Sequence, residues 1–399
     1  MKPTNSRRNF LKKSTTGLAG FFAFGKLSAS HSIISNSKNE QKVIYRTLGK
    51  TGIKLPVISS GKLPMNNENV AKAILNSKII HIDNAHRYDN GKNEELLGKL
   101  LKNYPREKLI ISSKIPDEFN STDSLPEEVI IKKMTEKLDE SLHRIGSNYL
   151  DILYLHSVAS KEIVLFKPYI NFFKKVKKEG KAKFVGISTH KNEPEVIRAA
   201  IESNFYDVVL TAVNFKKEEC IDIMAAINEA ADAGLGIIAM KVFAGGFIDK
   251  LRTKPINKKA ALKWVLQNKN VHTAILSIKS FNDLEEYIAV MNNLELTEEE
   301  KLELEIQKEE VGMYCPGCNQ CVEQCPYHIE IPDIMRAYMY AYGYNNLKES
   351  KELLNKLKLA KNVCEECDVC AVKCPAGFEV QNKIKDIKRL IHVPNEFLT

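Results

Sequence analysis

Eight short apolar runs alternate with amphipathic stretches between about residue 43 and residue 292. The runs are almost continuously apolar, which is the pattern of parallel strands in a sheet that is covered on both faces. They span residues 55–60, 79–83, 109–114, 150–156, 182–188, 208–214, 236–241 and 273–278. Of the stretches between them, residues 127–144 place Ile131, Met134, Leu138 and Leu142 on one helical face, and residues 217–232 predict a helix ended by Gly234. Eight strand–helix units predict an α/β fold, a (β/α)₈ TIM barrel.

Segments on either side of this pattern predict the rest of the organisation. Residues 43–48 and 54–55, around a turn at 49–52, are expected to form a hairpin across the bottom of the barrel. The strongly acidic residues 294–311 predict a connecting helix, and residues 332–342, 346–360 and 384–390 predict further helices. We therefore expect a barrel at residues 43–293, a connecting helix at 294–311 and a small, mostly α-helical domain at 312–399.

Three ionisable residues end three neighbouring strands of the predicted barrel. Asp83 ends the second run, Lys114 the third and His156 the fourth, while Tyr88 lies in the loop after Asp83. Catalytic groups of such barrels come from the carboxyl ends of the strands, so these four side chains are expected to meet at one rim. Tyr88 would donate a proton to a carbonyl oxygen, and a nearby Lys114 ammonium, held by Asp83, would lower the pKa of the phenol from about 10. His156 would orient the carbonyl by a hydrogen bond.

Residues 43–292 resemble the aldo/keto reductase family. The matching stretches are IDNA at 82–85 followed by Tyr88, EELLG at 94–98, SK at 113–114, SL at 141–142, YLD at 149–151, LH at 155–156, GK at 180–181 and VGIS at 185–188. The tetrad of Asp, Tyr, Lys and His in that family corresponds to Asp83, Tyr88, Lys114 and His156. The resemblance implies reduction of aldehydes or ketones with a nicotinamide cofactor across the barrel mouth. His86 and His190 are further candidates for substrate contact.

The resemblance also implies where the nicotinamide cofactor would bind. Ser188 and Asn214 match positions that hold the carboxamide, Lys241 lies next to the position that stacks on the ring, and Lys279 with Ser280 matches a segment that grips the 2′-phosphate of NADP. Three departures stand beside these matches. Leu210 replaces a usual glutamine, Met240-Lys241 replaces a usual tyrosine, and Asp283, Glu285 and Glu286 stand where an arginine is expected. NADP and NAD therefore both stay open.

Eight of the nine cysteines form two identical motifs. Each motif has the spacing C-x₂-C-x₂-C-x₃-C-P, with the cysteines at 315, 318, 321 and 325 and again at 364, 367, 370 and 374. In this bacterial ferredoxin spacing the fourth cysteine ligates the other cluster. One [4Fe–4S] cluster is therefore expected on Cys315, Cys318, Cys321 and Cys374, and a second on Cys364, Cys367, Cys370 and Cys325. Zinc or disulfides are the alternatives, but neither explains two runs ending in Cys-Pro. Cys220 is expected to be a buried thiol.

The first thirty residues predict a signal peptide for export. Arg7-Arg8 precede Phe10-Leu11-Lys12, a short apolar run spans residues 17–25, and the small residues 28–30 suggest cleavage near His31. This order resembles a twin-arginine (Tat) signal peptide, which serves folded, cofactor-loaded proteins and would make the mature protein periplasmic after a linker at 31–42. The run is too short for a stable membrane anchor. Residues 1–30 carry six of the nine net positive charges, so the remainder gives no argument for a nucleic-acid partner.

Three functions remain open at this point. The first is an exported oxidoreductase that exchanges hydride between a bound nicotinamide and a small carbonyl or alcohol substrate, with the clusters relaying electrons to a redox partner protein at the ferredoxin-type domain. The second is a redox-neutral enzyme with a trapped NAD(P), acting on a sugar-like substrate and using the clusters for structure. The third is a non-enzymatic exported electron carrier. The substrate and the oligomeric state are not predicted.

Overall fold

Residues 42–399 form one compact unit in a computed structural model of the chain. The structure describes residues 42–117, 125–217, 220–360, 362–365 and 367–398. The predicted signal peptide at 1–30, the linker up to residue 41 and the side chain of Cys220 lie outside this description. Within the described residues, no helix is long and apolar enough to cross a membrane.

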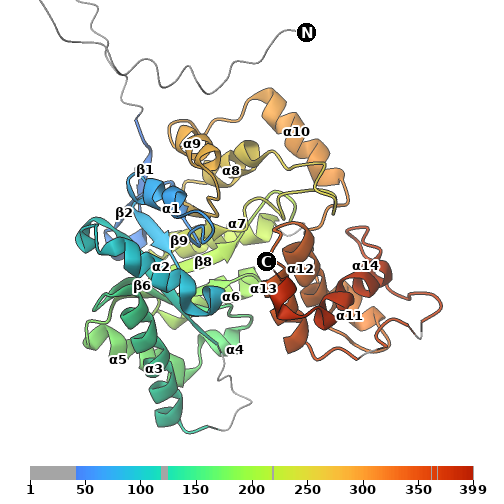
Figure 1. Cartoon of the computed structure of the whole chain (residues 1–399), viewed down its shortest axis with the longest axis horizontal. Helices are drawn as coiled ribbons and strands as arrows, with labels where there is room; N and C mark the ends of the chain where they lie inside the picture. Colours follow the sequence, from blue (N-terminus) through green and yellow to red (C-terminus); the bar gives the residue numbers. More distant parts are fainter. Residues whose placement is uncertain (1–41, 118–124, 218–219, 361, 366, 399) are drawn as a thin grey trace, which may run out of the picture. The chain divides into compact units, whose positions relative to one another are not determined.

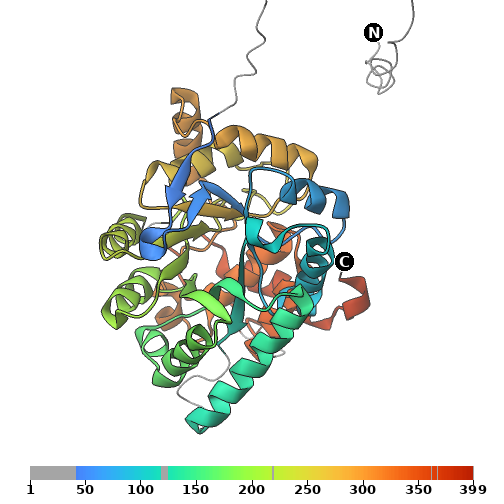
Figure 2. The same ribbon diagram turned by 90° about the vertical axis from the view of Figure 1, so that its left-hand side faces the viewer.

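Eight parallel strands close into a barrel, which confirms the predicted fold class (Figures 1 and 2). Each strand pairs with its neighbours in chain order, and β10 closes the sheet by pairing with β3. The strands are β3 (Ile58–Ser60), β4 (His81–Asp83), β5 (Ile110–Pro116), β6 (Leu150–His156), β7 (Ala182–Thr189), β8 (Val208–Ala212), β9 (Gly236–Met240) and β10 (Thr273–Leu276). Every one of them lies within a predicted apolar run or extends it by at most two residues.

Helices follow the strands and cover the outside of the barrel (Figure 2). They are α1 (Glu68–Leu75), α2 (Lys92–Leu101), α3 (Glu127–Ile145), α4 (Lys161–Val164), α5 (Lys167–Lys178), α6 (Glu193–Ser203), α7 (Cys220–Asp232), α8 (Lys258–Gln267) and α9 (Phe281–Val290). The helix expected over 127–144 is α3, which begins after Pro126 and ends at Gly146 in a left-handed conformation. The helix expected over 217–232 corresponds to α7.

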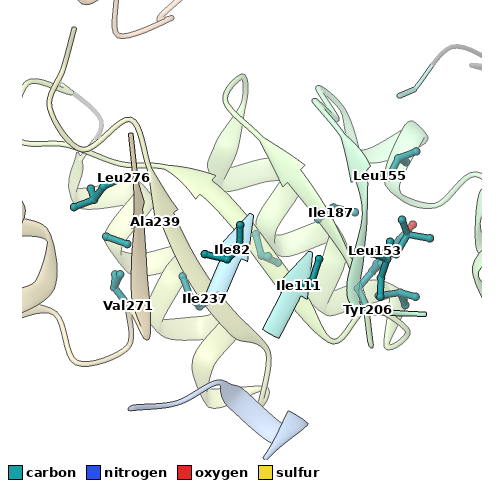
Figure 3. Packing of buried hydrophobic residues seen from close by; sticks show 14 of the residues in the cluster. Ile82, Ile111, Leu153, Leu155, Ile187, Tyr206, Ile237, Ala239, Val271 and Leu276 are labelled. Atoms are coloured by element: carbon teal, nitrogen blue, oxygen red, sulfur yellow. The ribbon is translucent and has the colours of Figure 1, made fainter. Parts of the chain in front are cut away.

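Alternate residues of each strand serve two different cores. Leu153 and Leu155 of β6 point outward to the helices, as do Ile187 of β7 and Ile237 of β9 (Figure 3). The residues between them fill the inside of the barrel in a separate cluster, which consists of Leu48, Leu55, Ile152, Tyr154, Val208, Leu210 and Ile238. This two-sided burial explains why the strands are almost continuously apolar in the sequence.

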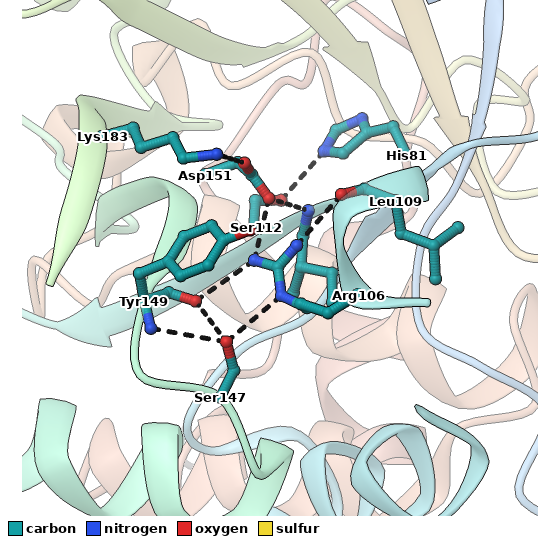
Figure 4. A network of polar contacts seen from close by, with 9 residues as sticks. His81, Arg106, Leu109, Ser112, Ser147, Tyr149, Asp151 and Lys183 are labelled. Atoms are coloured by element: carbon teal, nitrogen blue, oxygen red, sulfur yellow. Dashed lines mark hydrogen bonds and ion pairs between the residues drawn. The ribbon is translucent and has the colours of Figure 1, made fainter. Parts of the chain in front are cut away.

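A hairpin seals one end of the barrel, as the sequence predicts. Strand β1 (Tyr45–Thr47) pairs antiparallel with β2 (Lys54–Pro56), and Leu48 and Leu55 pack into the barrel interior. Near this end, Arg106 pairs with Asp151 at 2.8 Å and donates to the carbonyls of Leu109 and Tyr149 (Figure 4). Because Arg106 precedes β5 and Asp151 begins β6, this network joins the amino ends of two strands and leaves their carboxyl ends for other roles.

The C-terminal region is helical and has a core of its own. Its helices are α10 (Glu298–Glu309), α11 (Gln320–Gln324), α12 (Ile331–Tyr342), α13 (Leu347–Lys356) and α14 (Val380–Ile387). Apolar residues of α11 to α14 form one cluster that includes Cys321 and Cys325, with four other motif cysteines packed at its edge, while Leu304 of α10 belongs to a separate cluster. The helices expected over 294–311, 332–342 and 346–360 occur as α10, α12 and the shorter α13. The helix expected over 384–390 begins earlier, as α14, and continues as a 3₁₀ turn at Lys388–His392.

Candidate functional site

The barrel rim holds a buried ion pair between Asp83 and Lys114. The ammonium of Lys114 contacts the Asp83 carboxylate and also donates to the carbonyl of Asn84 at 2.6 Å. Ser112 donates to the other carboxylate oxygen at 2.7 Å, and His81 contacts the Ser112 hydroxyl at 3.0 Å. Each charge therefore has two hydrogen-bond partners, which stabilise a pair whose side chains are only 1% exposed.

Tyr88 lies beside this pair in the loop after β4. It begins a 3₁₀ turn (Tyr88–Gly91) in which Asp89 and Asn90 adopt left-handed backbone conformations. The loop is tied to β5, because the His86 amide donates to the Lys114 carbonyl at 3.1 Å. The Lys114 ammonium lies 5.0 Å from the centre of the Tyr88 ring, and the His156 ring lies edge-on to Tyr88 at 6.0 Å. The structure thus brings the four predicted catalytic side chains together at one rim.

The electrostatics at Tyr88 differ from the sequence-based prediction. Burial raises the pKa of the Tyr88 hydroxyl well above its usual value of 10, and the Asp83 carboxylate raises it further. The Lys114 ammonium is paired with the Asp83 carboxylate, so the two opposite charges offset each other in their effect on the phenol. The predicted acidification of the phenol is therefore wrong for this state, and Tyr88 is held in its protonated form.

His156 ends β6 and is held neutral. Burial lowers its pKa well below 6.5, and the charges of Arg87, Lys114 and Lys241 lower it further. Its side chain is 8% exposed, and its Nδ1 atom has no hydrogen-bond partner in the part of the chain that the structure describes. A neutral imidazole with an unengaged ring nitrogen can hydrogen-bond a neutral oxygen of a substrate.

Arg87 is a rim residue that the sequence analysis missed. It directly precedes Tyr88, and its charge affects the pKa values of Tyr88, Lys114 and His156. Its guanidinium pairs with Glu349 of α13 at 3.6 Å, so a C-terminal residue reaches the barrel rim. An arginine next to the predicted proton donor was a usable indication, but its partner is 262 positions away and no local pattern identifies it.

The two identically spaced motifs lie close to each other, and their cysteines are grouped as the predicted exchange of the fourth ligand requires. Cys315 interacts with Cys321, Cys374 and Cys318, while Cys364 interacts with Cys370, Cys367 and Cys325. A cavity of about 30 Å³ is lined by Cys325, Cys364, Cys367 and Cys370 together with apolar side chains. All eight motif cysteines are free of disulfides. No three His, Cys, Asp or Glu side chains in the described ranges are arranged to hold a single metal ion.

The residues present fit iron–sulfur clusters by their chemistry. Each set supplies four thiols, and sulfur is the ligand type of iron–sulfur clusters. Burial raises the pKa of the Cys315 thiol to about 12 and that of Cys321 to about 11, so iron would displace the protons on binding. A bound cluster accepts or gives one electron at a time.

Comparison with known families assigns both parts of the chain. A model described as the aldo/keto reductase family matches residues 64–260, and a model described as a 4Fe-4S dicluster domain matches residues 314–379. The chain carries an aldo/keto reductase domain followed by a 4Fe-4S dicluster domain. This agrees with the sequence-based resemblance, while the boundaries predicted for the domains stay predictions.

Individual relatives match the aldo/keto reductase domain over nearly their full length. L-galactose dehydrogenase of Arabidopsis thaliana is 24% identical over 295 residues, which cover 64% of this chain and 90% of the relative. L-glyceraldehyde 3-phosphate reductase of Escherichia coli O157:H7 is 24% identical over 336 residues, covering 68% and 94%. A solved aldo-keto reductase from Bacillus halodurans in its holo form has a TM-score of 0.53 at 20% identity, covering 67% of this chain and 96% of its own. That likeness shows the fold.

The predicted nicotinamide contacts of the aldo/keto reductase domain are already engaged. Asn214 donates to the Lys241 carbonyl at 3.2 Å, and its side chain is hydrogen-bonded to Tyr314. The Lys241 ammonium donates to the Tyr340 hydroxyl at 2.9 Å, and Lys279 donates to the Tyr344 carbonyl at 3.2 Å. The remaining two are Ser188, which accepts from the Ser157 amide at 3.0 Å, and Ser280, which caps α9.

These residues do not fit a dinucleotide in this arrangement. Of the five predicted cofactor residues, Asn214, Lys241 and Lys279 are each in contact with a tyrosine that follows the barrel in the chain. The cavity between Lys241, His190 and Cys315 has a volume of only about 30 Å³. A cavity of that volume holds about two water molecules. His190 lines this cavity, and burial lowers its pKa well below 6.5.

Proposed function

We propose that this protein is an oxidoreductase that converts a carbonyl into an alcohol at the barrel rim, with Tyr88 as the proton donor. The observation that carries the proposal is the convergence of Tyr88, Lys114 and His156 around the buried Asp83 carboxylate. The match to the aldo/keto reductase family supports the reaction class.

The raised pKa of Tyr88 favours reduction over oxidation. A phenol that stays protonated at neutral pH can give its proton to an alkoxide, because the conjugate acid of an alkoxide is weaker still. The reverse reaction needs the phenolate as a base, and burial with the nearby Asp83 makes that form scarce. His156 is neutral and would orient the carbonyl oxygen toward Tyr88 by a hydrogen bond.

The two clusters are the electron carriers in the proposed function. Reduction of a carbonyl to an alcohol takes up two electrons and two protons. The two [4Fe–4S] clusters together hold two transferable electrons, Tyr88 supplies the proton on oxygen, and solvent water supplies the proton that forms the new C–H bond. Lys241 and Lys279, which the resemblance assigns to the nicotinamide cofactor, are engaged by Tyr340 and Tyr344, so no step is routed through that cofactor. A redox partner protein would recharge the clusters one electron at a time.

The test is an anaerobic single-turnover experiment on the full chain with both clusters loaded. The clusters are reduced chemically, aldehydes and ketones are added, and reoxidation is followed by cluster absorbance together with alcohol formation. Tyr88→Phe is expected to slow alcohol formation by about 10²- to 10⁴-fold, which is the usual contribution of a general acid. The iron content of this variant should equal that of the parent.

Tyr104→Phe is the matched control for loss of a phenol. Tyr104 precedes β5 at the amino end of the strands, and its hydroxyl makes only a 3.4 Å contact to the Lys72 carbonyl. This variant should keep the parental rate. Equal rates for Tyr88→Phe and the parent would refute the role of Tyr88, and a lack of response to every carbonyl would refute the reaction class.

We further propose that the protein is exported through the twin-arginine pathway and works in the periplasm. The support is the order of Arg7-Arg8, a short apolar run and small residues at the start of the chain. Replacing both arginines by lysine is expected to retain the folded, iron-loaded protein in the cytoplasm. Export of that variant at the parental level would contradict the proposal.

A further inference from the structure

A short segment after the barrel occupies the place that the family resemblance gives to the dinucleotide. Residues 340–346, which we call the plug, join α12 to α13 and lie against the loops that follow β9 and β10. The Tyr340 hydroxyl accepts from Lys241, and the Tyr344 hydroxyl is hydrogen-bonded to the backbone of Gly245. The Tyr344 carbonyl accepts from Lys279. The plug thus holds both lysines that were predicted to bind the cofactor.

Two glycines allow the plug to approach the barrel backbone closely. A Cβ atom added to Gly343 would lie 2.6 Å from the carbonyl oxygen of Gly245, which is closer than a methyl group can approach backbone. Gly245 has φ +95° and faces Met339 of α12, where an added Cβ would lie 3.2 Å from the Met339 side chain. Only glycine at these two positions permits this contact without a shift of one of the loops.

The contact extends beyond the plug on both sides. A separate apolar cluster combines Phe215, Ala244 and Ile248 of the barrel loops with Tyr314 and Met339 of the C-terminal region. At the rim, Arg87 pairs with Glu349 of α13. Lys241 also lies 5.0 Å from the centre of the Tyr340 ring, which adds a cation–π contact to its hydrogen bond. The engagement of the cofactor residues is therefore part of a continuous, specific interface.

We propose that the plug and a nicotinamide dinucleotide compete for the same cleft of the barrel. In the arrangement described here the cleft is closed, and a dinucleotide binds only after residues 340–346 leave Lys241 and Lys279. The inference takes the cofactor positions from the family resemblance and is independent of the chemistry proposed for Tyr88. It implies that the dicluster domain controls access of the cofactor to the aldo/keto reductase domain.

Competition of this kind weakens apparent binding by the fraction of molecules that are open. A change that destabilises the plug without touching the cleft must then tighten dinucleotide binding. Gly343→Ala is such a change, since the new methyl group would collide with the Gly245 carbonyl. Tyr344→Phe removes the hydrogen bond to the Gly245 backbone, and Tyr340→Phe removes the one to Lys241.

The experiment is calorimetric titration of NADP⁺ and NAD⁺ into the full chain with both clusters loaded and no substrate present. Weak binding is expected for the parent, with a Kd that falls about tenfold or more in Gly343→Ala. A smaller decrease of the Kd is expected in Tyr344→Phe and in Tyr340→Phe. These two variants test the competition between plug and dinucleotide if Gly343→Ala does not fold. Hydrogen exchange supplies a second readout, since a bound dinucleotide should raise exchange at residues 340–346.

Tyr342→Phe is the matched control on the same helix. Tyr342 lies within residues 340–346, but its ring centre is 4.6 Å from that of Tyr338 and it packs against the core of the dicluster domain, so loss of its hydroxyl should leave the Kd unchanged. A Kd that is equal in the parent and all three plug variants would overturn the proposal. Increased protection of residues 340–346 on dinucleotide binding would also overturn it, because the plug would then cover the cofactor instead of competing with it. Neither result depends on the Tyr88→Phe experiment.

Discussion

The barrel and the dicluster domain bury their side chains in different ways. The barrel has two apolar clusters, a large one between the sheet and its helices and a small one inside the sheet. The dicluster domain has one main cluster, built from short helices, and Cys321 and Cys325 are part of it. Its remaining six motif cysteines are only partly buried.

This difference separates two sources of stability. A closed sheet satisfies its own backbone hydrogen bonds and needs no cofactor to hold its shape. A small helical domain with cysteines in its core gains stability from the metal that those cysteines bind. We therefore expect the barrel to respond to changes in packing and charge, and the dicluster domain to respond to loss of a ligand.

The largest effect is expected from removal of one cluster ligand. Cys374→Ala deletes the ligand that the second motif is predicted to supply to the cluster on Cys315, Cys318 and Cys321. Iron should fall from about eight to about four per chain, because a [4Fe–4S] cluster is held by four thiolates. Hydrogen exchange should rise in α11, α12 and α14 and stay unchanged in the barrel strands.

Cys220→Ala is the control, because Cys220 lies outside both motifs and should leave the iron content unchanged. If Cys374→Ala kept the full iron content, the proposed ligand sets would be wrong. If the barrel strands also lost protection, the two regions would not have separate sources of stability.

A charge change in the barrel should have the next largest effect. Asp83→Ala leaves the Lys114 ammonium buried without its carboxylate, which costs about 3–5 kcal/mol of unfolding free energy. Urea unfolding followed by Trp264, the only tryptophan and a residue of the barrel helix α8, measures this directly. Asp83→Ala combined with Lys114→Met should recover much of the loss. Full stability of the single variant would show that the pair is not required by the barrel.

The pH dependence of barrel stability should be smaller. Burial lowers the pKa of His81 to about 4, although the charges of Asp83 and Asp151 act in the opposite direction. His81 therefore stays neutral in the native state below pH 6.5, where the same residue binds a proton in the unfolded chain. Its contribution to stability is complete above pH 6.5 and is lost as the pH falls toward 4, by about 2 kcal/mol between about pH 7 and pH 5. Trp264 unfolding curves should show this slope, and His81→Asn should flatten it. His143→Asn, on the surface of α3, should not change it.

The smallest effect is expected at the surface between the two regions. Lys250 pairs with Asp386 of α14 at 2.9 Å, with half of the lysine side chain exposed. Exposed pairs contribute about 0–1 kcal/mol and are weakened by salt. Lys250→Ala should therefore raise hydrogen exchange in α14 only slightly, and high salt should remove the difference. A change of more than about 2 kcal/mol would show that this pair is part of the main interface.

The barrel could be predicted from the sequence because its strands are buried on both faces. Such strands read as apolar runs, and the strand β6 (Leu150–His156) matches its predicted range residue for residue. The tetrad could be predicted because three strand ends carry ionisable residues and all strands of a barrel end at the same rim. The cysteine motifs could be predicted because their spacing is set by the cluster.

The interface could not be predicted in the same way, because its contacts join residues remote in sequence. Every second residue from 338 to 344 is a tyrosine. Tyr338 and Tyr342 lie on the side of α12 that packs on the core of the dicluster domain. Tyr340 and Tyr344 lie on another side, and two aromatic residues there would indicate a contact surface without identifying its partner. The direction of the pKa shift of Tyr88 was predicted wrongly because the sequence does not show how deeply the phenol is buried.

The exchange of the fourth cysteine between motifs has a consequence for biosynthesis. Neither proposed cluster can be completed on the ribosome until Cys364, Cys367 and Cys370 have emerged, and the cluster on Cys315 must wait for Cys374. The last barrel strand ends at Leu276, almost a hundred residues earlier, so the barrel can close during translation. Iron delivery would then act on a chain whose catalytic half is already folded, and the maturation machinery would meet the two halves in a fixed temporal order.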